Sequence, residues 1–300
     1  MANLSPMMQH YVATKEEYKD CILFYRLGDF YEMFFEDAVT VSRELELTLT
    51  GKECGLEERA PMCGVPYHAA ETYVSRLIEK GYKVAICEQV EDPRTAKGMV
   101  KREVTRVVTP GTNLNTQGLD EGKNNYLMSI VCLADRYGIA AADVTTGDCF
   151  LTEVDKERKL LDEINKFSPA EIICNNALLV SGIDLEDLKG RMHIAVSALD
   201  SWYFDDDLCH RTLKEHFRVA TVEGLGIGDY GCGVIAAGAL FQYLLETQKN
   251  SLEHMTRIVP YAAEKSMLTD SSSRRNLELV ETLREKQKRG SLLWVLDKTR

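Results

Sequence analysis

The sequence lacks several motifs that mark common enzyme classes. No G-x-x-x-x-G-K-[ST] run occurs among its 300 residues, so nothing in it binds ATP through a P-loop. The nine cysteines include no Cys-x-x-Cys pair, and such an odd, scattered set indicates reduced thiols rather than a disulfide framework. Cys54, Cys63, His68 and Cys87 have a spacing that fits no known zinc pattern, so we expect no metal site.

Long apolar runs are missing too. The most apolar stretch, Val234 to Leu245, contains Gln242 and is too short to cross a bilayer. Asn3, Ser5 and Gln9 interrupt any apolar start of the chain, so we expect no signal peptide. Together these absences predict a cytoplasmic protein.

Positive charge is scarce overall. The net charge of −11 argues against a protein that coats nucleic acid by charge alone. One segment differs, because between positions 94 and 106 five cations face a single anion, Glu103, which gives +4. The five are Arg94, Lys97, Lys101, Arg102 and Arg106. Such a run is usually a solvated face, and its functional interpretation is a local phosphate-binding edge on an acidic body.

The remaining composition is that of an ordinary globular protein, with 45% hydrophobic and 28% charged residues. Single hydrophobic cores stop growing near this length, so we expect two domains with separate cores. The segment from Asn113 to Asn125 is rich in Asn, Gly and Thr and has little to bury, which is typical of a linker. The predicted division is a first domain at 1–115, a linker at 116–124, a second domain at 125–250 and a helical segment at 251–300.

One stretch near the N-terminus has a strong local pattern. Its apolar start, Cys21 to Leu27, is typical of a strand, and Gly28 with Asp29 indicates a sharp turn. Apolar positions at helical spacing from Phe30 to Leu45 predict that a helix follows. Asp29 would be the N-cap of that helix, and Glu32 would complete a capping box.

Two interpretations of Phe30 follow from this pattern. Phe30 would share a helical face with Phe34, and aromatic residues at that spacing pack in cores more often than they contact a ligand. As the first helical residue, however, Phe30 can also project past the end of the element. Local physics favours core packing and leaves a functional aromatic as the alternative.

The rest of the first domain mixes predicted strands and helices, which indicates a small mixed-sheet α/β domain. Pro6 opens a helix that ends near Asp20, and prolines and glycines shape the segment from Ala60 to His68 into a loop. The other predicted elements are strands at Leu45–Thr50, Tyr82–Cys87 and Glu103–Thr109, and a helix at Ala69–Glu79.

The second domain begins with three strand patterns in quick succession, which predict two consecutive hairpins. The three lie at Tyr126–Leu133, Gly138–Thr145 and Cys149–Val154. Helices and strands follow at Lys156–Phe167, Glu171–Cys174, His193–Ala198, Asp206–Phe217 and Cys232–Glu246. Three antiparallel strands followed by alternating α and β elements is the order of the ribonuclease H-like fold.

That fold raises an enzymatic alternative, a metal-dependent nuclease. Asp135, Asp143 and Asp148 lie in or beside the hairpins, and a two-metal nuclease needs clustered carboxylates on such strands. Aspartates are also favoured in hairpin turns for local hydrogen bonding alone. No later acidic residue stands out as a partner, so we favour the structural interpretation and keep Asp143 as the residue to test.

The character of the chain changes beyond Ser251. The cluster Ser271–Ser273 is a candidate helix N-cap, and apolar residues recur at helical spacing from Leu277 to Leu293. The chain ends at Arg300 inside this pattern, without a capping residue or a glycine stop. We therefore expect a truncated piece of a longer protein.

The stretch from Phe24 to Phe34, with Gly-Asp-Phe-Tyr-Glu at its centre, resembles the mismatch-recognition signature of the MutS family of DNA mismatch repair ATPases. The core of that signature, Phe-x-Glu, is Phe30-Tyr31-Glu32 here. The resemblance continues in order along the whole chain. It includes Pro61-Met62-Cys63-Gly64-Val65-Pro66-Tyr67-His68, Ile86-Cys87-Glu88-Gln89, Val107-Val108-Thr109-Pro110-Gly111-Thr112, Asp143-Val144-Thr145-Thr146-Gly147 and Arg274-Arg275-Asn276-Leu277-Glu278.

The resemblance implies a mismatch-recognition domain, a ribonuclease H-like connector domain without nuclease activity, and the first helices of an all-α core or lever domain. It implies that Phe30 wedges into DNA at a mispaired or unpaired base and kinks it, and that Glu32 discriminates beside it. Leu27, Asp29 and Met62 would be minor-groove or backbone neighbours of that pair.

The resemblance also implies which parts of the family are absent. The clamp and the C-terminal ATPase have no counterpart here, so we expect no enzymatic activity and no cofactor in this piece, whereas the full-length protein would use ATP and Mg. The implied partners are mismatched double-stranded DNA and, through the connector domain, the repair protein MutL. We expect a homodimer in the full-length protein and a monomer for this piece.

Overall fold

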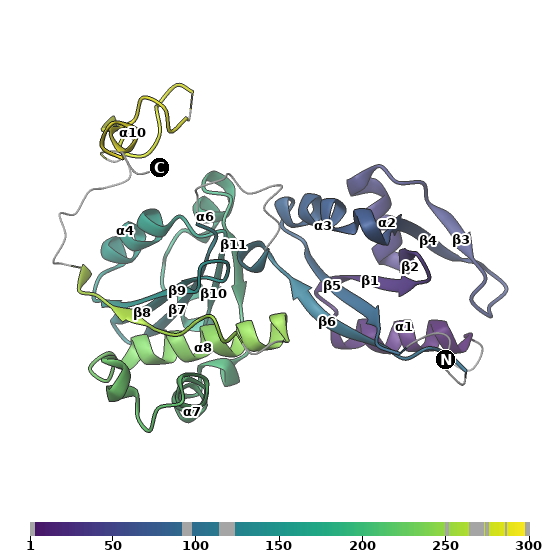
Figure 1. The fold of residues 1–300 in the computed structure, drawn as a ribbon, viewed down its shortest axis with the longest axis horizontal. Coiled ribbons are helices and arrows are strands. Elements are labelled where there is room, and N and C mark those ends of the chain that lie inside the picture. Colours follow the sequence, from purple (N-terminus) through teal and green to yellow (C-terminus); the bar gives the residue numbers. More distant parts are fainter. Residues whose placement is uncertain are drawn as a thin grey trace.

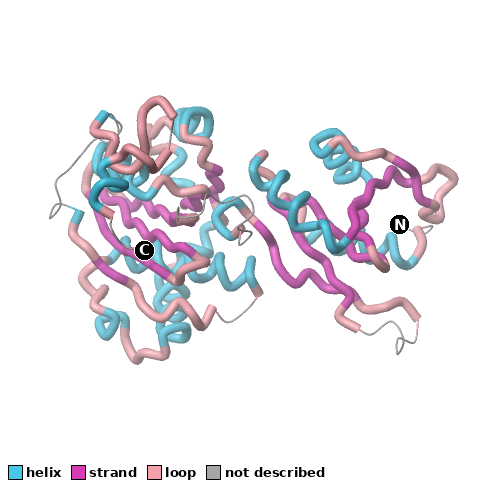
Figure 2. Tube along the Cα trace, turned by 45° about the horizontal axis from the view of Figure 1, so that its top comes forward, coloured by secondary structure: helices cyan, strands magenta, loops and turns pink. Residues whose placement is uncertain are grey.

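The computed structural model describes residues 4–91, 98–113, 124–249, 252–263, 273, 276–285 and 287–297. In these ranges the chain forms two six-stranded sheets, which Figure 1 shows side by side. Figure 2, turned from that view, shows the sheets in two separate lobes. Nearly all of the predicted linker at 116–124 lies outside the described residues.

The first sheet is mixed, and its central strand is the first in the sequence. Its members are β1 (Cys21–Leu27), β2 (Phe30–Phe34), β3 (Thr50–Lys52), β4 (Ala60–Pro66), β5 (Lys83–Gln89) and β6 (Arg102–Val108). Their order across the sheet is β3-β4-β2-β1-β5-β6. β1 pairs antiparallel with β2 and parallel with β5, so the hairpin that contains Gly28 lies in the middle of the sheet.

Helices cover both faces of the first sheet because its strands bury side chains on both faces. On β1, Leu23 and Tyr25 point to one face and Ile22 and Phe24 to the other, as the alternation of a strand requires. The helices are α1 (Pro6–Glu17) on the face of Leu23 and Tyr25, and α2 (Phe35–Leu45) and α3 (Ala70–Glu79) on the opposite face. Two short 3-10 turns, η1 (Tyr67–Ala69) and η2 (Pro110–Thr112), complete this part of the chain.

The predicted helix start at Phe30 is wrong. Residues 30–34 form β2, and the helix α2 begins only at Phe35. Asp29 therefore lies in a hairpin turn and is not an N-cap. Glu32 is a strand residue and takes no part in a capping box.

The physical reason is a period-two pattern that competes with the helical one. Tyr31 and Met33 are buried in the core under α2 and α3, whereas Phe34 is buried on the face of α1. Strand pairing on both sides of β2 satisfies this alternation, and a helix cannot place these side chains on two opposite faces.

Two neighbouring predictions are also wrong. α2 runs to Leu45, so the strand predicted at Leu45–Thr50 is reduced to β3 at its end. The loop predicted from Ala60 begins instead as β4, because this segment pairs with β2 on one side and β3 on the other. The opening helix, the helix before Gly81 and the strands β5 and β6 are confirmed to within a few residues at their ends.

The second sheet begins with the two predicted hairpins. Its strands are β7 (Tyr126–Leu133), β8 (Arg136–Asp143), β9 (Asp148–Val154), β10 (Glu171–Cys174), β11 (Ala195–Ala198) and β12 (Val259–Pro260). β7, β8 and β9 are antiparallel, β10 and β11 add in parallel beside β7, and β12 adds in parallel beside β9. This order confirms the predicted three-stranded meander followed by alternating α and β elements, and the structure adds that the later strands pair in parallel.

Helices again lie on both faces of the second sheet (Figure 1). One face carries α7 (Asp206–Phe217) and α8 (Gly231–Gln248), and the other carries α4 (Glu157–Phe167), α5 (Asn176–Leu179) and α6 (Leu185–Arg191). The 3-10 turns are η3 (Ser201–Phe204) and η4 (Val222–Leu225). None of the helices in the described ranges is both long and apolar enough to span a membrane.

The long helix predicted from Leu277 to Leu293 is wrong. The described residues between 277 and 290 form turns and bends, and a five-residue helix, α10 (Leu292–Leu296), follows. Leu277, Val280 and Leu283 are exposed, and an amphipathic pattern without a surface to pack on does not hold a helix in water. Most of the cluster Ser271–Ser273 lies outside the described residues.

Residues 252–263 pack against the second sheet, although the predicted boundary assigns them to the helical segment. Leu252, Met255 and Ile258 are buried in the core under α7 and α8. The hydroxyl of Thr152 on β9 donates to the backbone carbonyl of Tyr261 at 2.7 Å.

Candidate nucleic-acid interface

Phe30 lies at the tip of the β1–β2 hairpin, and 46% of its surface is exposed. The register places it between Leu27 on β1 and Pro66 on β4. Strand alternation puts Phe30 on the same sheet face as α1, away from the core under α2 and α3. The ring is therefore presented to solvent from a strand of the central hairpin and is not part of the core.

The hairpin turn that holds Phe30 contains only Gly28 and Asp29. Gly28 has a φ of +58°, which L side chains rarely adopt. Arg26 Nε donates to the Gly28 carbonyl at 2.6 Å, and the Tyr67 amide donates to the Asp29 carbonyl at 2.9 Å. The Arg26 guanidinium also lies 3.9 Å from the centre of the Tyr67 ring, so the turn is braced from outside.

Tyr31 anchors the same strand from the opposite face. Its hydroxyl donates to Glu88 on β5, and Arg26 Nη1 lies 3.8 Å from the other oxygen of that carboxylate. Burial, and after it the Glu88 carboxylate, raise the pKa of the Tyr31 hydroxyl, so it remains a protonated donor at neutral pH. The residue between Phe30 and Glu32 thus fixes the strand.

Glu32 shares the sheet face of Phe30, two residues further along β2. Its side chain is 17% exposed, and its Oε2 lies 2.5 Å from Nζ of Lys52 on β3. Two residues of strand span about 7 Å, so the carboxylate lies close to the Phe30 ring on the same face.

The other predicted neighbours of this pair divide between the sheet and the turn. Leu27 and Met62 are partly exposed and point to the face of Phe30, since Leu27 lies opposite Phe30 and Met62 lies opposite Phe34 in the register. Asp29 is exposed in the turn itself. Leu27, Asp29 and Met62 therefore surround the Phe30–Glu32 edge.

The predicted phosphate-binding run does not form one exposed cationic surface in the described residues. Arg102 is 8% exposed and donates to the backbone carbonyls of Arg26 and Val100, each at 2.8 Å. Lys101 forms an ion pair with Glu103 at 2.6 Å, and Arg106 pairs with Glu71. Arg94 and Lys97 lie outside the described residues.

Asp143, the residue of the nuclease alternative, has a structural environment. It is fully buried, and its two oxygens accept from the amides of Asn125 and Thr145, at 3.1 and 2.8 Å, and from the Thr145 hydroxyl at 2.6 Å. Asp148 pairs with Asp143 in the register, whereas Asp135 lies at the other end of β8. Within the described ranges no group of three or more His, Cys, Asp or Glu residues could hold a metal ion.

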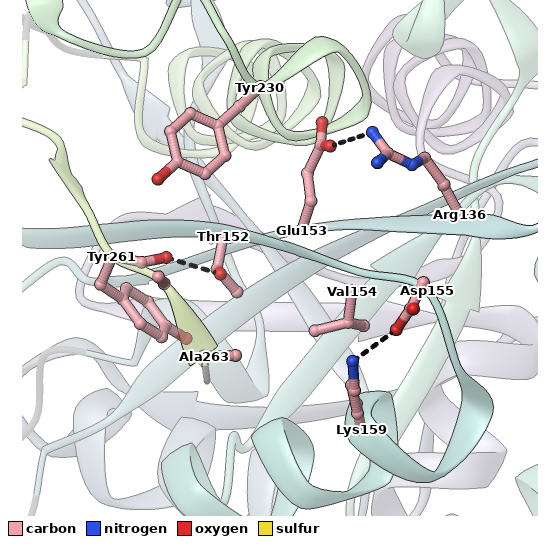
Figure 3. Close-up of a pocket in the computed structure, with 10 residues that line it drawn as sticks. Arg136, Thr152, Glu153, Val154, Asp155, Lys159, Tyr230, Tyr261 and Ala263 are labelled. Carbon is pink, nitrogen blue, oxygen red and sulfur yellow. Dashed lines mark hydrogen bonds and ion pairs between the residues drawn. The ribbon is translucent and has the colours of Figure 1, made fainter. Parts of the chain in front are cut away.

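The second domain has an open pocket of about 270 Å³ beside β9 (Figure 3). Its charged side chains pair with one another across the lining. Arg136 pairs with Glu153 at 3.2 Å and Lys159 pairs with Asp155 at 2.7 Å. Glu153 also accepts from the Gly233 amide at the start of α8, at 2.9 Å. The Glu153 bond ties the start of α8 to β9, and the Lys159–Asp155 pair stabilises the start of α4, so these charged side chains have structural roles.

All nine cysteines are free thiols, and eight of them are buried. Burial raises the pKa of Cys63 and Cys87 to about 12, so these thiols are protonated and poor metal ligands at neutral pH.

Sequence reasoning missed Lys52. It follows the strand predicted at Leu45–Thr50 and lies 20 residues from Glu32 in the sequence. Only the pairing of β3 with β4, and of β4 with β2, brings the two side chains to one edge of the sheet. No local pattern of the sequence could have identified this ion pair.

Comparison with known proteins identifies similarity along most of the chain. Residues 5–117 match the family model of MutS domain I, and residues 125–256 match that of MutS domain II. Over 300 residues the chain is 67% identical to the DNA mismatch repair protein MutS of Lachnoclostridium phytofermentans, covering 100% of this chain and 32% of that protein. It is 56% identical to the MutS protein of Ruminiclostridium cellulolyticum, covering 100% of this chain and 34% of that protein. The chain spans about a third of the length of these curated relatives.

Proposed function

This chain belongs to the MutS family of DNA mismatch repair proteins, and we propose that its first domain reads mispaired or unpaired bases in double-stranded DNA. The observation that carries the proposal is the exposed Phe30 ring at the tip of a braced hairpin, with the Glu32 carboxylate beside it on the same face. The second domain would connect this reading unit to other parts of the complete protein.

Phe30 would act as a wedge inserted from the minor groove. Unstacking one base step costs roughly a few kcal/mol, and stacking a base on an aromatic ring returns about 1 to 3 kcal/mol. These two terms nearly cancel on fully paired DNA. A mispaired or unpaired base costs less to unstack, so insertion and kinking become favourable there. Specificity would then arise from the deformability of the site rather than from base identity.

Glu32 would sharpen this selection by opposing the wrong target. A carboxylate that approaches the phosphates of an intact duplex is repelled, whereas beside a displaced base it can accept a hydrogen bond from a ring nitrogen. The penalty on paired DNA and the gain at a mismatch both increase the difference between the two duplexes.

The remaining parts of the proposal concern the complete protein. ATP and Mg would act in regions outside this chain, together with the clamp and the contacts that form a homodimer. MutL would bind through the second domain. The reading domain itself would then need no catalytic residue, and the buried, locally bonded Asp143 is in keeping with a connector that does not cut DNA.

The test is Phe30→Ala in the complete protein. We expect the affinity for a mismatched duplex to fall about tenfold, towards that for a matched duplex, because one stacking interaction is lost. The two affinities are measured by fluorescence anisotropy on duplexes that differ only in one base. Thermal stability should stay unchanged, since the ring is half exposed.

Val39→Ala is the matched control. Val39 is 40% exposed, and it lies on α2, which covers the opposite face of the sheet. Its truncation removes a similarly exposed apolar side chain without touching the proposed interface. If Phe30→Ala kept the same preference for mismatched DNA as the unmodified protein, the wedge proposal would be wrong.

A further inference from the structure

Lys52 and Glu32 form an ion pair that reaches across three strands. Lys52 lies on β3, Glu32 on β2, and β4 runs between them. Nζ and Oε2 are 2.5 Å apart, with the lysine side chain 34% exposed and the glutamate side chain 17% exposed. The pair is therefore partly shielded from water and stands beside Phe30 on the proposed reading face.

Gly64 leaves space beside the Glu32 side chain. Gly64 is the β4 residue directly opposite Glu32. A Cβ there would lie 3.2 Å from the Tyr31 carbonyl oxygen, which is a tight contact, and 3.5 Å from Glu32 Cγ, so it would fill the space beside the glutamate side chain. The Lys52 ammonium passes 5.6 Å from the centre of the buried Phe34 ring. Sheet packing thus directs Lys52 towards Glu32.

If Phe30 and Glu32 read DNA as proposed, the ion pair would respond differently to a matched and to a mismatched duplex. On a matched duplex no displaced base is available to Glu32. The ion pair would then persist, and the Lys52 ammonium would not contact a phosphate. At a mismatch a displaced base can take the carboxylate as its hydrogen-bond acceptor. The ammonium is then released beside the DNA backbone, where it can replace a condensed counterion.

Resting on the proposed function of Phe30 and Glu32, we infer that Lys52 is a specificity-determining residue that exchanges Glu32 for a DNA phosphate only when a base has been displaced. The exchange adds a phosphate contact to the mismatched complex and withholds it from the matched one. Lys52 contacts the backbone, yet it contributes to selectivity because Glu32 controls its release.

The experiment is the salt dependence of DNA binding by the Lys52→Met variant of the complete protein. The slope of log affinity against log salt counts the phosphates that the protein neutralises. We expect Lys52→Met to reduce this slope by about 1 on a mismatched duplex and to leave it unchanged on a matched duplex. In Glu32→Ala, where Lys52 is released from the start, the slope on the matched duplex should rise by about 1.

Two variants serve as controls. Lys52→Arg keeps the cation and should restore the slope on the mismatched duplex. Lys80→Met removes a lysine of similar exposure that pairs with Glu44 at 3.0 Å, at the ends of α3 and α2 on the opposite face of the sheet. It should change neither slope. Thermal stability of the four variants equal to that of the unmodified protein would show that they are folded.

The possible outcomes separate this inference from the proposed function. An equal loss of slope on both duplexes would make Lys52 a permanent phosphate contact, and no loss on either would make it structural, so either result overturns the exchange. In both cases Phe30→Ala would still abolish the preference for mismatches. If the unmodified protein had no such preference, or if Phe30→Ala preserved it, the proposed function and the exchange would fail together.

Discussion

In the proposed function, Glu32 would increase selectivity by opposing the binding of matched DNA. It is tied to the sheet by Lys52 and carries its charge where DNA would approach Phe30. We expect Glu32→Ala to tighten binding to a matched duplex about two- to fivefold, because a surface charge pair of this kind changes interaction energies by up to about 1 kcal/mol. Affinities at low salt, measured by gel shift, check this.

Glu44→Ala is the matched control for that prediction. Glu44 also forms an ion pair with a lysine, Lys80, but on the other face of the sheet. Its loss should leave both affinities unchanged. The repulsion argument would be wrong if Glu32→Ala bound the matched duplex no more tightly than the unmodified protein does.

Other residues near the proposed interface form bonds within the protein that stabilise the fold. Arg102 has a cationic side chain in the predicted phosphate run, yet it is buried and donates to two backbone carbonyls. One of those carbonyls belongs to Arg26, which itself braces the Gly28 turn. Arg102 therefore supports the shape of the hairpin.

At the scale of elements, the β1–β2 hairpin is fixed on three sides. β5 pairs with β1, β4 pairs with β2, and the Arg26–Tyr67 contact holds the turn. A side chain that inserts into DNA must resist the force of the DNA it deforms. A hairpin fixed in a sheet is therefore better suited to carry a wedge than a loop is. The position of Phe30 at the tip of the hairpin follows from the pairing of β2 with β1 and β4. A helix starting at Phe30 would lack this pairing and could not hold the ring at the same place.

In the second domain the long helix α8 lies unusually close to β8. A Cβ added to Gly138 on β8 would lie 2.1 Å from the Cys232 carbonyl oxygen and 2.7 Å from the Gly233 amide. Backbone atoms cannot move aside as a flexible side chain can. Gly138 is therefore the residue that permits the start of α8 to rest on the sheet.

We expect Gly138→Ala to lower the stability of this packing by about 2 to 3 kcal/mol, because overpacking against backbone forces α8 to shift. Faster hydrogen exchange of the α8 amides in the complete protein would report the change. Gly224→Ala is the control, since a Cβ there meets nothing within 4 Å. Unchanged exchange in α8 of Gly138→Ala would contradict the close approach.

At the scale of the whole molecule, Glu171 joins the two sheets. It is fully buried on β10 and accepts from the Thr109 hydroxyl at 2.5 Å, the Gly111 amide at 3.1 Å and the Tyr243 hydroxyl at 2.8 Å. Thr109 and Gly111 follow directly after β6 of the first sheet. Burial, and after it the Glu171 carboxylate, raise the pKa of Tyr243 well above its ordinary value, so the tyrosine remains a donor.

We expect Glu171→Gln to weaken this junction by about 1 to 3 kcal/mol, because an amide nitrogen would face donors that need an acceptor. Hydrogen exchange at Thr112, whose amide lies in the same turn, should speed up in the complete protein. Glu16→Gln, in an exposed pair with Lys19, should change nothing. Equal exchange in Glu171→Gln and the unmodified protein would show that the carboxylate does not hold the two sheets together.

Further contacts support the same junction. Gln248, at the end of α8, donates to the backbone carbonyl of Val107 on β6 at 3.4 Å. Lys249 donates to the Tyr18 hydroxyl beyond α1 at 2.6 Å. The second domain therefore contacts the first through the end of its longest described helix as well as through Glu171.

The sequence by itself determined those parts of the protein whose pattern is local. Strand patterns in quick succession at Tyr126–Leu133 and its two successors predict the meander β7–β9, and the structure confirms it. The ordered series of motifs around Phe30-Tyr31-Glu32 indicates the MutS family, which the family matches confirm. Local strand patterns and ordered motifs are carried by neighbouring residues, so no fold is needed to recognise them.

Only the tertiary structure decided what depends on residues far apart in the chain. Residues 30–34 suit both a helix and a strand, and pairing with β1 and β4 selected the strand and exposed Phe30. Lys52 meets Glu32 because β4 brings β3 to β2, and Glu171 meets Thr109 across 62 positions of sequence. Such contacts form because burial and strand pairing stabilise the whole sheet, and this stabilisation outweighs weak local preferences.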